Sequence, residues 1–189
     1  MLLNLLVHQP QMLGQIVQHT PYWVWGLLVG LLGLGCSQLF DRQAGLRRVL
    51  LMPVAMTGFS VYGLASAFGG SGHAGAAVLI WLAAAAMVTG LALSFRPTAP
   101  SGTLYAAPSR SFWLPGSAIP LALIVGIFLT KYLVGVELAM QPTLAQDGPF
   151  VLQIAALYGV FNGLFVARSL RLLRLARQST AFAATTASA

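Results

Sequence analysis

Residues 117–140 read SAIPLALIVGIFLTKYLVGVELAM, and this run decides the class of fold. It contains two charged side chains, Lys131 and Glu137, in a stretch that is otherwise almost entirely apolar. The hydrocarbon core of a bilayer is about 30 Å thick, and a helix needs about 20 mostly apolar residues to cross it. Residues 117–140 therefore predict a transmembrane helix.

Four further stretches meet the same criterion, at residues 22–40, 49–68, 74–95 and 149–172. With residues 117–140 they predict an all-α fold, a polytopic transmembrane helical bundle of five spans that occupies residues 20–178. After this bundle, Ala, Thr and Ser dominate residues 179–189, a composition that predicts a disordered tail.

Residues 1–19 precede the first span and carry a helical stripe of apolar side chains opposite a row of glutamines. This pattern predicts a short amphipathic helix that lies on the outer face of the membrane. The alternative interpretation is a helix docked onto the bundle.

The composition of the whole chain agrees with a membrane protein. Of its 189 residues, ten are basic and three acidic, and the charged share of 7% compares with about 25% in an average soluble domain. This excludes a soluble enzyme and a disordered chain, and the single cysteine excludes a disulfide scaffold. A net charge of +7 would suggest nucleic acid as a partner of a soluble protein, but we expect no nucleic acid here, because surplus arginines of membrane proteins mark cytoplasmic loops.

The arginines fall on alternate connections between the predicted spans. Arg42, Arg47 and Arg48 follow the first span, and Arg96 and Arg110 follow the third. At and beyond the end of the fifth span lie Arg168, Arg171, Arg174 and Arg177. The connections at residues 69–73 and 141–148 contain no arginine or lysine. This pattern predicts an N-terminus outside the cell and a C-terminus in the cytoplasm.

The last four of these arginines are spaced three apart on a helix that leaves the membrane. We expect anionic lipid headgroups to be the partners of Arg168, Arg171, Arg174 and Arg177.

The connection at residues 96–116 is the longest, and its prolines keep it from forming a helix. Residues 103–105 and 111–113 flank Ala106–Arg110 and are rich in residues typical of strands. They predict a short hairpin whose aromatic side chains rest at the membrane interface.

Small residues form ridges on three of the predicted spans. Ala155, Gly159, Gly163 and Ala167 lie four apart on the fifth span, and similar ridges are Gly26, Gly30 and Gly33 on the first and Ala83, Ala86 and Gly90 on the third. Such ridges let helices approach closely in a membrane. Packing within one chain is the favoured interpretation, and a homodimer or another membrane partner is the alternative.

Lys131 is the one basic residue that the topology does not explain. A lysine at the centre of a span costs roughly 2.5–3.5 kcal/mol on insertion scales, so such residues usually have a function. Counting residues from the ends of the spans places four polar side chains at a similar depth, namely Thr57, Ser60, Tyr158 and Asn162. We therefore expect a polar layer around Lys131 that binds or transports a small polar solute, an ion or a proton. The alternative is a structural or accessory membrane subunit, in which neighbouring groups hold Lys131 for packing.

No catalytic motif is present in the sequence. It contains no nucleophile motif, glycine-rich phosphate loop or paired carboxylates. His8, His19 and His73 are predicted to share the outer side of the membrane, but no two have the spacing of metal ligands, and Cys36 is the single cysteine. We expect neither an enzyme nor a bound metal or cofactor.

Four segments together carry a resemblance to a known family. They are HTPYWVW (19–25), LRRVLLMP (46–53), LPGSAIPLALIVGIFLTKYLVGV (114–136) and ALYGVFNGLFVARSLRLLRLARQ (156–178). The chain resembles a family of small bacterial inner-membrane proteins that is known as a domain of unknown function. The resemblance implies a bacterial inner (plasma) membrane and a single helical bundle, and it implies no substrate, cofactor or catalytic residue.

Overall fold

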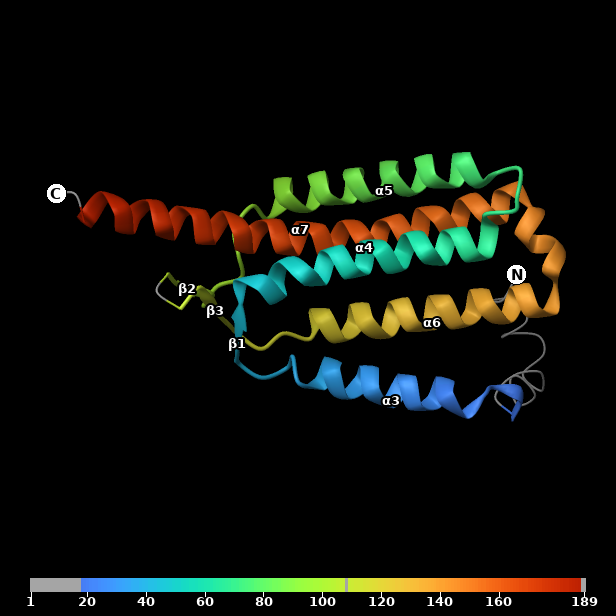
Figure 1. The fold of residues 1–189 in the computed structure, drawn as a ribbon, viewed down its shortest axis with the longest axis horizontal. Helices are drawn as coiled ribbons and strands as arrows, with labels where there is room; N and C mark the ends of the chain where they lie inside the picture. The colour runs from blue at the N-terminus through green and yellow to red at the C-terminus, as the bar shows by residue number, and fades with distance from the viewer. Residues whose placement is uncertain (1–17, 108, 188–189) are drawn as a thin grey trace. The chain divides into compact units, whose positions relative to one another are not determined.

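The structure is a computed structural model, and it describes residues 18–107 and 109–187. It is mostly helical, in agreement with the predicted all-α class (Figure 1). The helices are α3 (Tyr22–Cys36), α4 (Leu46–Phe68), α5 (Ala74–Phe95), α6 (Ile119–Met140) and α7 (Gly148–Ala187), and the short 3-10 helix η1 spans Pro142–Gln146. Four of them, α4, α5, α6 and the Gly148–Ser179 part of α7, are long and apolar enough to cross a membrane.

The helix α3 is shorter than the span expected at residues 22–40. It has 15 residues and ends at Cys36, directly before the polar pair Ser37 and Gln38. The amide N–H groups of Gln38 and Leu39 donate to carbonyls three residues earlier, which turns the backbone out of the helix. Gln38 then uses its own carbonyl to accept the N–H of Ser117. An average hydropathy over residues 22–40 hides this turn, because Leu39 and Phe40 compensate for Ser37 and Gln38.

The C-terminal end of α7 also differs from the prediction. The helix continues to Ala187, where the sequence favoured a disordered tail at residues 179–189. Alanine is the strongest helix former, so the alanine-rich segment can extend a helix without packing against anything. At the other terminus, the interfacial helix expected at residues 1–19 lies almost wholly outside the described residues.

The chain divides into two compact units. In the described part of the chain, the first unit comprises residues 18–39 and Ser117–Leu144, and the second comprises Phe40–Gly116 and residues 145–187. In the first unit α3 packs against α6. They pack tightly at Gly35, where an added Cβ would collide with the side chain of Leu121. The ridge expected at Gly26, Gly30 and Gly33 faces away from this contact, since no atom of the described residues lies within 4 Å of a Cβ built there.

In the second unit α7 packs against both α4 and α5 (Figure 1). Its ridge of small residues meets α5, as a Cβ built on Gly159 would collide with the carbonyl of Trp81, and one on Gly163 would lie 2.6 Å from the carbonyl of Ala85. Packing within one chain is therefore confirmed for this ridge. The ridge expected on the third span is exposed, because α5 buries a different face that includes Ala77, Trp81 and Ala84.

A three-stranded antiparallel sheet completes the second unit. Its strands are β1 (Arg42–Gly45), β2 (Leu104–Ala106) and β3 (Ser111–Leu114), in the order β1-β3-β2. The hairpin expected around residues 106–110 is confirmed by the pairing of β2 with β3. The strand β1 was not expected, because the short segment between two spans carries no alternating pattern.

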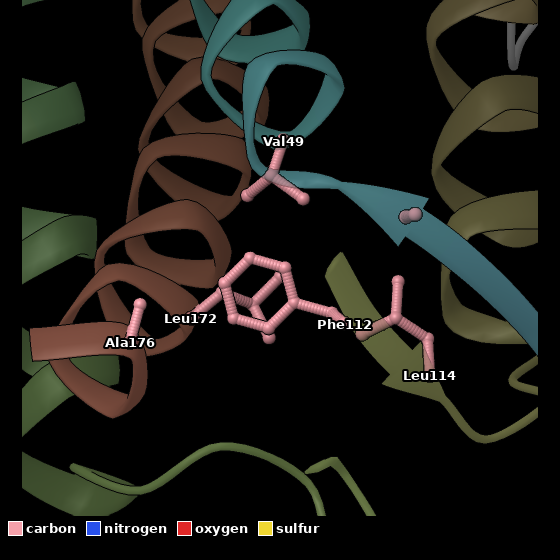
Figure 2. Packing of buried hydrophobic residues seen from close by; sticks show 6 residues of the cluster. Val49, Phe112, Leu114, Leu172 and Ala176 are labelled. Carbon is pink, nitrogen blue, oxygen red and sulfur yellow. The ribbon is translucent and has the colours of Figure 1, made fainter. Parts of the chain in front are cut away.

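One face of the sheet packs onto the C-terminal half of α7. Phe112 is fully buried and lies among Val49, Leu114, Leu172 and Ala176 (Figure 2). This cluster joins the two arginine-bearing connections to the arginine-bearing part of α7. All nine arginines of the chain therefore belong to the second unit.

We expect Gly159→Ala to lower the melting temperature of the detergent-solubilised protein, because the added methyl group forces α7 away from the backbone of α5. The expected loss is about 1–3 kcal/mol of unfolding free energy, as for other overpacked sites. Gly90→Ala is the matched control, since its Cβ meets no atom of the described part of the chain within 4 Å and alanine favours the helix. Equal melting temperatures for the two variants would contradict the assigned packing.

Candidate functional site

The polar residues expected to form a layer are distributed over both units. Thr57 and Ser60 lie on α4, and Tyr158 and Asn162 lie on α7, so these four share the second unit. Lys131 lies on α6 in the first unit. The grouping of Lys131 with the other four residues stays a prediction.

Thr57 and Asn162 form a hydrogen bond that joins α4 to α7. The hydroxyl of Thr57 donates to Oδ1 of Asn162 over 3.0 Å. Asn162 is buried, and Thr57 is partly buried. A polar side chain at such a position costs free energy unless it finds a partner, so the bond selects this pairing of α4 with α7.

Ser60 makes a second interhelical bond, this time with α5. Nε1 of Trp81 donates to the hydroxyl oxygen of Ser60 over 2.9 Å, and both residues are buried. Trp81 was not among the expected site residues. The sequence could have indicated this contact, because a buried indole N–H needs a hydrogen-bond acceptor at the same depth in the bundle.

Tyr158 lies on the same helix as Asn162 and the small-residue ridge. It is buried on α7, next to Gly159 and one turn before Asn162. Thr89 adds a further polar contact, since its hydroxyl donates to the carbonyl of Gly163 over 3.2 Å. The second unit thus holds its three helices together with polar contacts as well as with close packing.

Lys131 lies in a different setting on α6, where it is partly buried. The hydroxyl of the preceding residue, Thr130, donates to the carbonyl of Gly126 over 2.8 Å and stays on its own helix. The hydroxyl of the following residue, Tyr132, is hydrogen-bonded to the hydroxyl of Thr20. The residues beside Lys131 therefore use their hydroxyl groups within the first unit.

The four arginines of α7 differ in their surroundings. Arg168 and Arg171 are partly buried, whereas Arg174 and Arg177 are exposed. Nη2 of Arg171 donates to the carbonyl of Ala92 in the last turn of α5. A cation at this position complements the negative end of the α5 dipole and so fastens α5 to α7.

Comparison with known proteins gives the family of the chain. A family of unknown function (DUF6622) matches residues 1–183. The chain belongs to this family. The match confirms the resemblance to a domain of unknown function and covers both units of this family member. No curated protein and no solved structure matches the chain.

We expect a double-mutant cycle of Thr57→Val and Asn162→Leu to reveal coupling between α4 and α7. Interhelical hydrogen bonds of membrane proteins give coupling energies of about 0.6 kcal/mol on average, with a maximum of about 1.7. The cycle is measured by reversible unfolding in mixed micelles.

A control cycle combines Asn162→Leu with Ser94→Ala. The hydroxyl of Ser94 is exposed and donates to a carbonyl of its own helix, so this pair should show no coupling. Additive effects of Thr57→Val and Asn162→Leu would contradict a stabilising role for their hydrogen bond.

Proposed function

We propose that this DUF6622 member is a structural or accessory protein of a membrane, without transport or enzymatic activity of its own. The observation that carries the proposal is the pair of interhelical hydrogen bonds, Thr57 with Asn162 and Ser60 with Trp81. These polar side chains bond to neighbouring helices of the same unit, which is what packing specificity requires.

The membrane itself is part of the proposal. Four long apolar helices support insertion, and many large apolar side chains on them are exposed, for example Leu51, Val54 and Leu79 at 68% each. We place the chain in a bacterial inner membrane with the N-terminus outside and the C-terminus in the cytoplasm. The sheet supports this orientation, because it brings the arginine-bearing connections together beside the arginine-bearing half of α7.

The exposed ridge of α3 supports the idea of a partner helix. Gly26, Gly30 and Gly33 are exposed, and a Cβ built on each meets no described atom within 4 Å. Close approach of a second helix is the usual role of such a surface in a membrane. The partner is a second copy of this chain or another membrane protein.

We expect a stable, stoichiometric partner to copurify with the tagged protein from its native membrane in mild detergent. Gly30→Leu should abolish the association, because the larger side chain keeps a partner helix away from α3. Gly58→Leu is the matched control, since Gly58 is also exposed and lies on α4. A monodisperse monomer without any partner would contradict the accessory function.

A second candidate function is the binding or transport of a small polar solute, an ion or a proton around Lys131. The observation that favours it is a partly buried lysine within an apolar helix that has the length of a membrane span. Intramembrane charges are expensive and usually serve a function. This candidate and the accessory function make opposite predictions for ion flux.

Under the accessory function, we expect liposomes that contain the purified protein to show the same proton and chloride flux as empty liposomes. Under the second candidate, the wild type conducts one of these ions and Lys131→Met abolishes the flux. Glu137→Gln is the control, because it removes the other charge of α6. Flux that depends on Lys131 would contradict the accessory function.

A further inference from the structure

Four arginines of the second unit gather where the sheet packs onto α7. We call Arg42, Arg48, Arg168 and Arg171 the arginine cluster. They come from β1, from the first turn of α4 and from α7, so they are distant in sequence. Two regular patterns of the backbone bring them to the same place.

The first pattern is the alternation of side chains along β1. Arg42 and Ala44 are two residues apart and so lie on the same face of the sheet. Ala44 is buried in the cluster that contains Leu172 and Ala176 of α7. Arg42 therefore lies on the face of the sheet that packs against α7, and its own partial burial agrees with this placement.

The second pattern is the helical repeat of α7. Arg168, Leu172 and Ala176 are four residues apart and share one face of the helix. Because Leu172 and Ala176 contact the sheet, Arg168 lies one turn before this contact on the same face. The guanidinium of Arg168 is close enough to those of Arg42 and Arg171 for their charges to interact.

The charges of the cluster repel one another, and Arg42, Arg168 and Arg171 are partly buried, whereas Arg48 is exposed. Burial and the neighbouring charge of Arg48 lower the pKa of Arg42. The second unit contains two acidic residues, Asp41 and Asp147, and Asp147 lies at the start of α7, about 30 Å along the helix from Arg168. Asp41, which is adjacent in sequence to Arg42, accepts the amide N–H of Gly116.

Arg171 shows that the cluster retains unused hydrogen-bonding capacity. One of its terminal nitrogens donates to the carbonyl of Ala92, which fixes the side chain. Its Nε is buried and has no hydrogen-bond partner among the described residues. A buried donor without a partner is costly, and an anion with several acceptor oxygens would satisfy it.

We propose that the arginine cluster is a binding site for a phosphate monoester, such as the headgroup of phosphatidic acid. Planar guanidinium groups bind phosphate oxygens through paired hydrogen bonds, and a phosphate monoester supplies close to two negative charges at neutral pH. The cluster lies beside helices that are long enough to cross a membrane, which favours a lipid as the source of the phosphate. This site would exist whether or not the chain has a protein partner.

The test titrates the full-length protein in uncharged detergent with short-chain phosphatidic acid and, separately, with inorganic phosphate. Binding is followed by the rise in melting temperature and by native mass spectrometry. We expect saturable, stoichiometric binding of phosphatidic acid. If inorganic phosphate binds saturably and with equal affinity, the cluster is a phosphate site whose ligand is soluble, and the assignment to a lipid is wrong.

Variants distinguish specific binding at the arginine cluster from a general attraction of anions to a positively charged protein. Arg42→Gln and Arg168→Gln should each weaken binding about tenfold, the effect of one lost charge-assisted hydrogen bond of about 1.4 kcal/mol. Arg174→Gln is the matched control, because Arg174 carries the same charge on the same helix but is exposed. Equal weakening by all three variants, or no saturable binding to the wild type, would overturn the proposal.

Lysine variants cover the case in which a glutamine variant fails to fold. Arg42→Lys and Arg168→Lys keep the charge but lose the planar fork, so they should fold and bind phosphatidic acid more weakly than the wild type. Wild-type affinity in both lysine variants would also overturn the proposal. It would show that binding depends on positive charge alone and not on paired hydrogen bonds from guanidinium groups to phosphate oxygens.

Discussion

The close approach of α5 and α7 is the contact on which the second unit depends. Gly159 and Gly163 leave no room for a side chain, because the backbone and side chains of α5 occupy that space. In a membrane there is no hydrophobic drive to bring apolar helices together, so close van der Waals contact must do it. Once α5 and α7 are in contact, Thr89 and Arg171 can reach backbone carbonyls across the interface.

Polar contacts then determine which helices are neighbours. The apolar faces of these helices are too alike to select one arrangement, whereas each hydrogen bond requires a particular partner at a particular depth. The bond from Thr57 to Asn162 places α4 against α7, and the bond from Trp81 to Ser60 places α5 against α4. A few polar groups thus define how the helices of the second unit are arranged in this family member.

The sheet gives the second unit a different kind of site. It covers part of α7 with a small apolar core around Phe112, and Arg42 lies on the face of the sheet that packs there. The arginines that indicate topology in the sequence therefore lie in two different environments. Some, such as Arg174, are exposed, whereas Arg171 is partly buried and its Nε has no hydrogen-bond partner among the described residues.

The sequence by itself determined the helical class, four long apolar helices, the hairpin at β2 and β3 and the small-residue ridge of α7. Each follows from a local repeat, because helices and hairpins record their periods in neighbouring residues. The end of α3 at Cys36, the strand β1 and the partners of Ser60 and Asn162 were decided by tertiary structure alone. These depend on residues distant in the chain, and apolar sequences do not encode which face of a helix meets which neighbour. Lys131 illustrates this limit. Counting residues along a span predicts how deep the lysine lies in the membrane, but it does not predict which side chains are its neighbours.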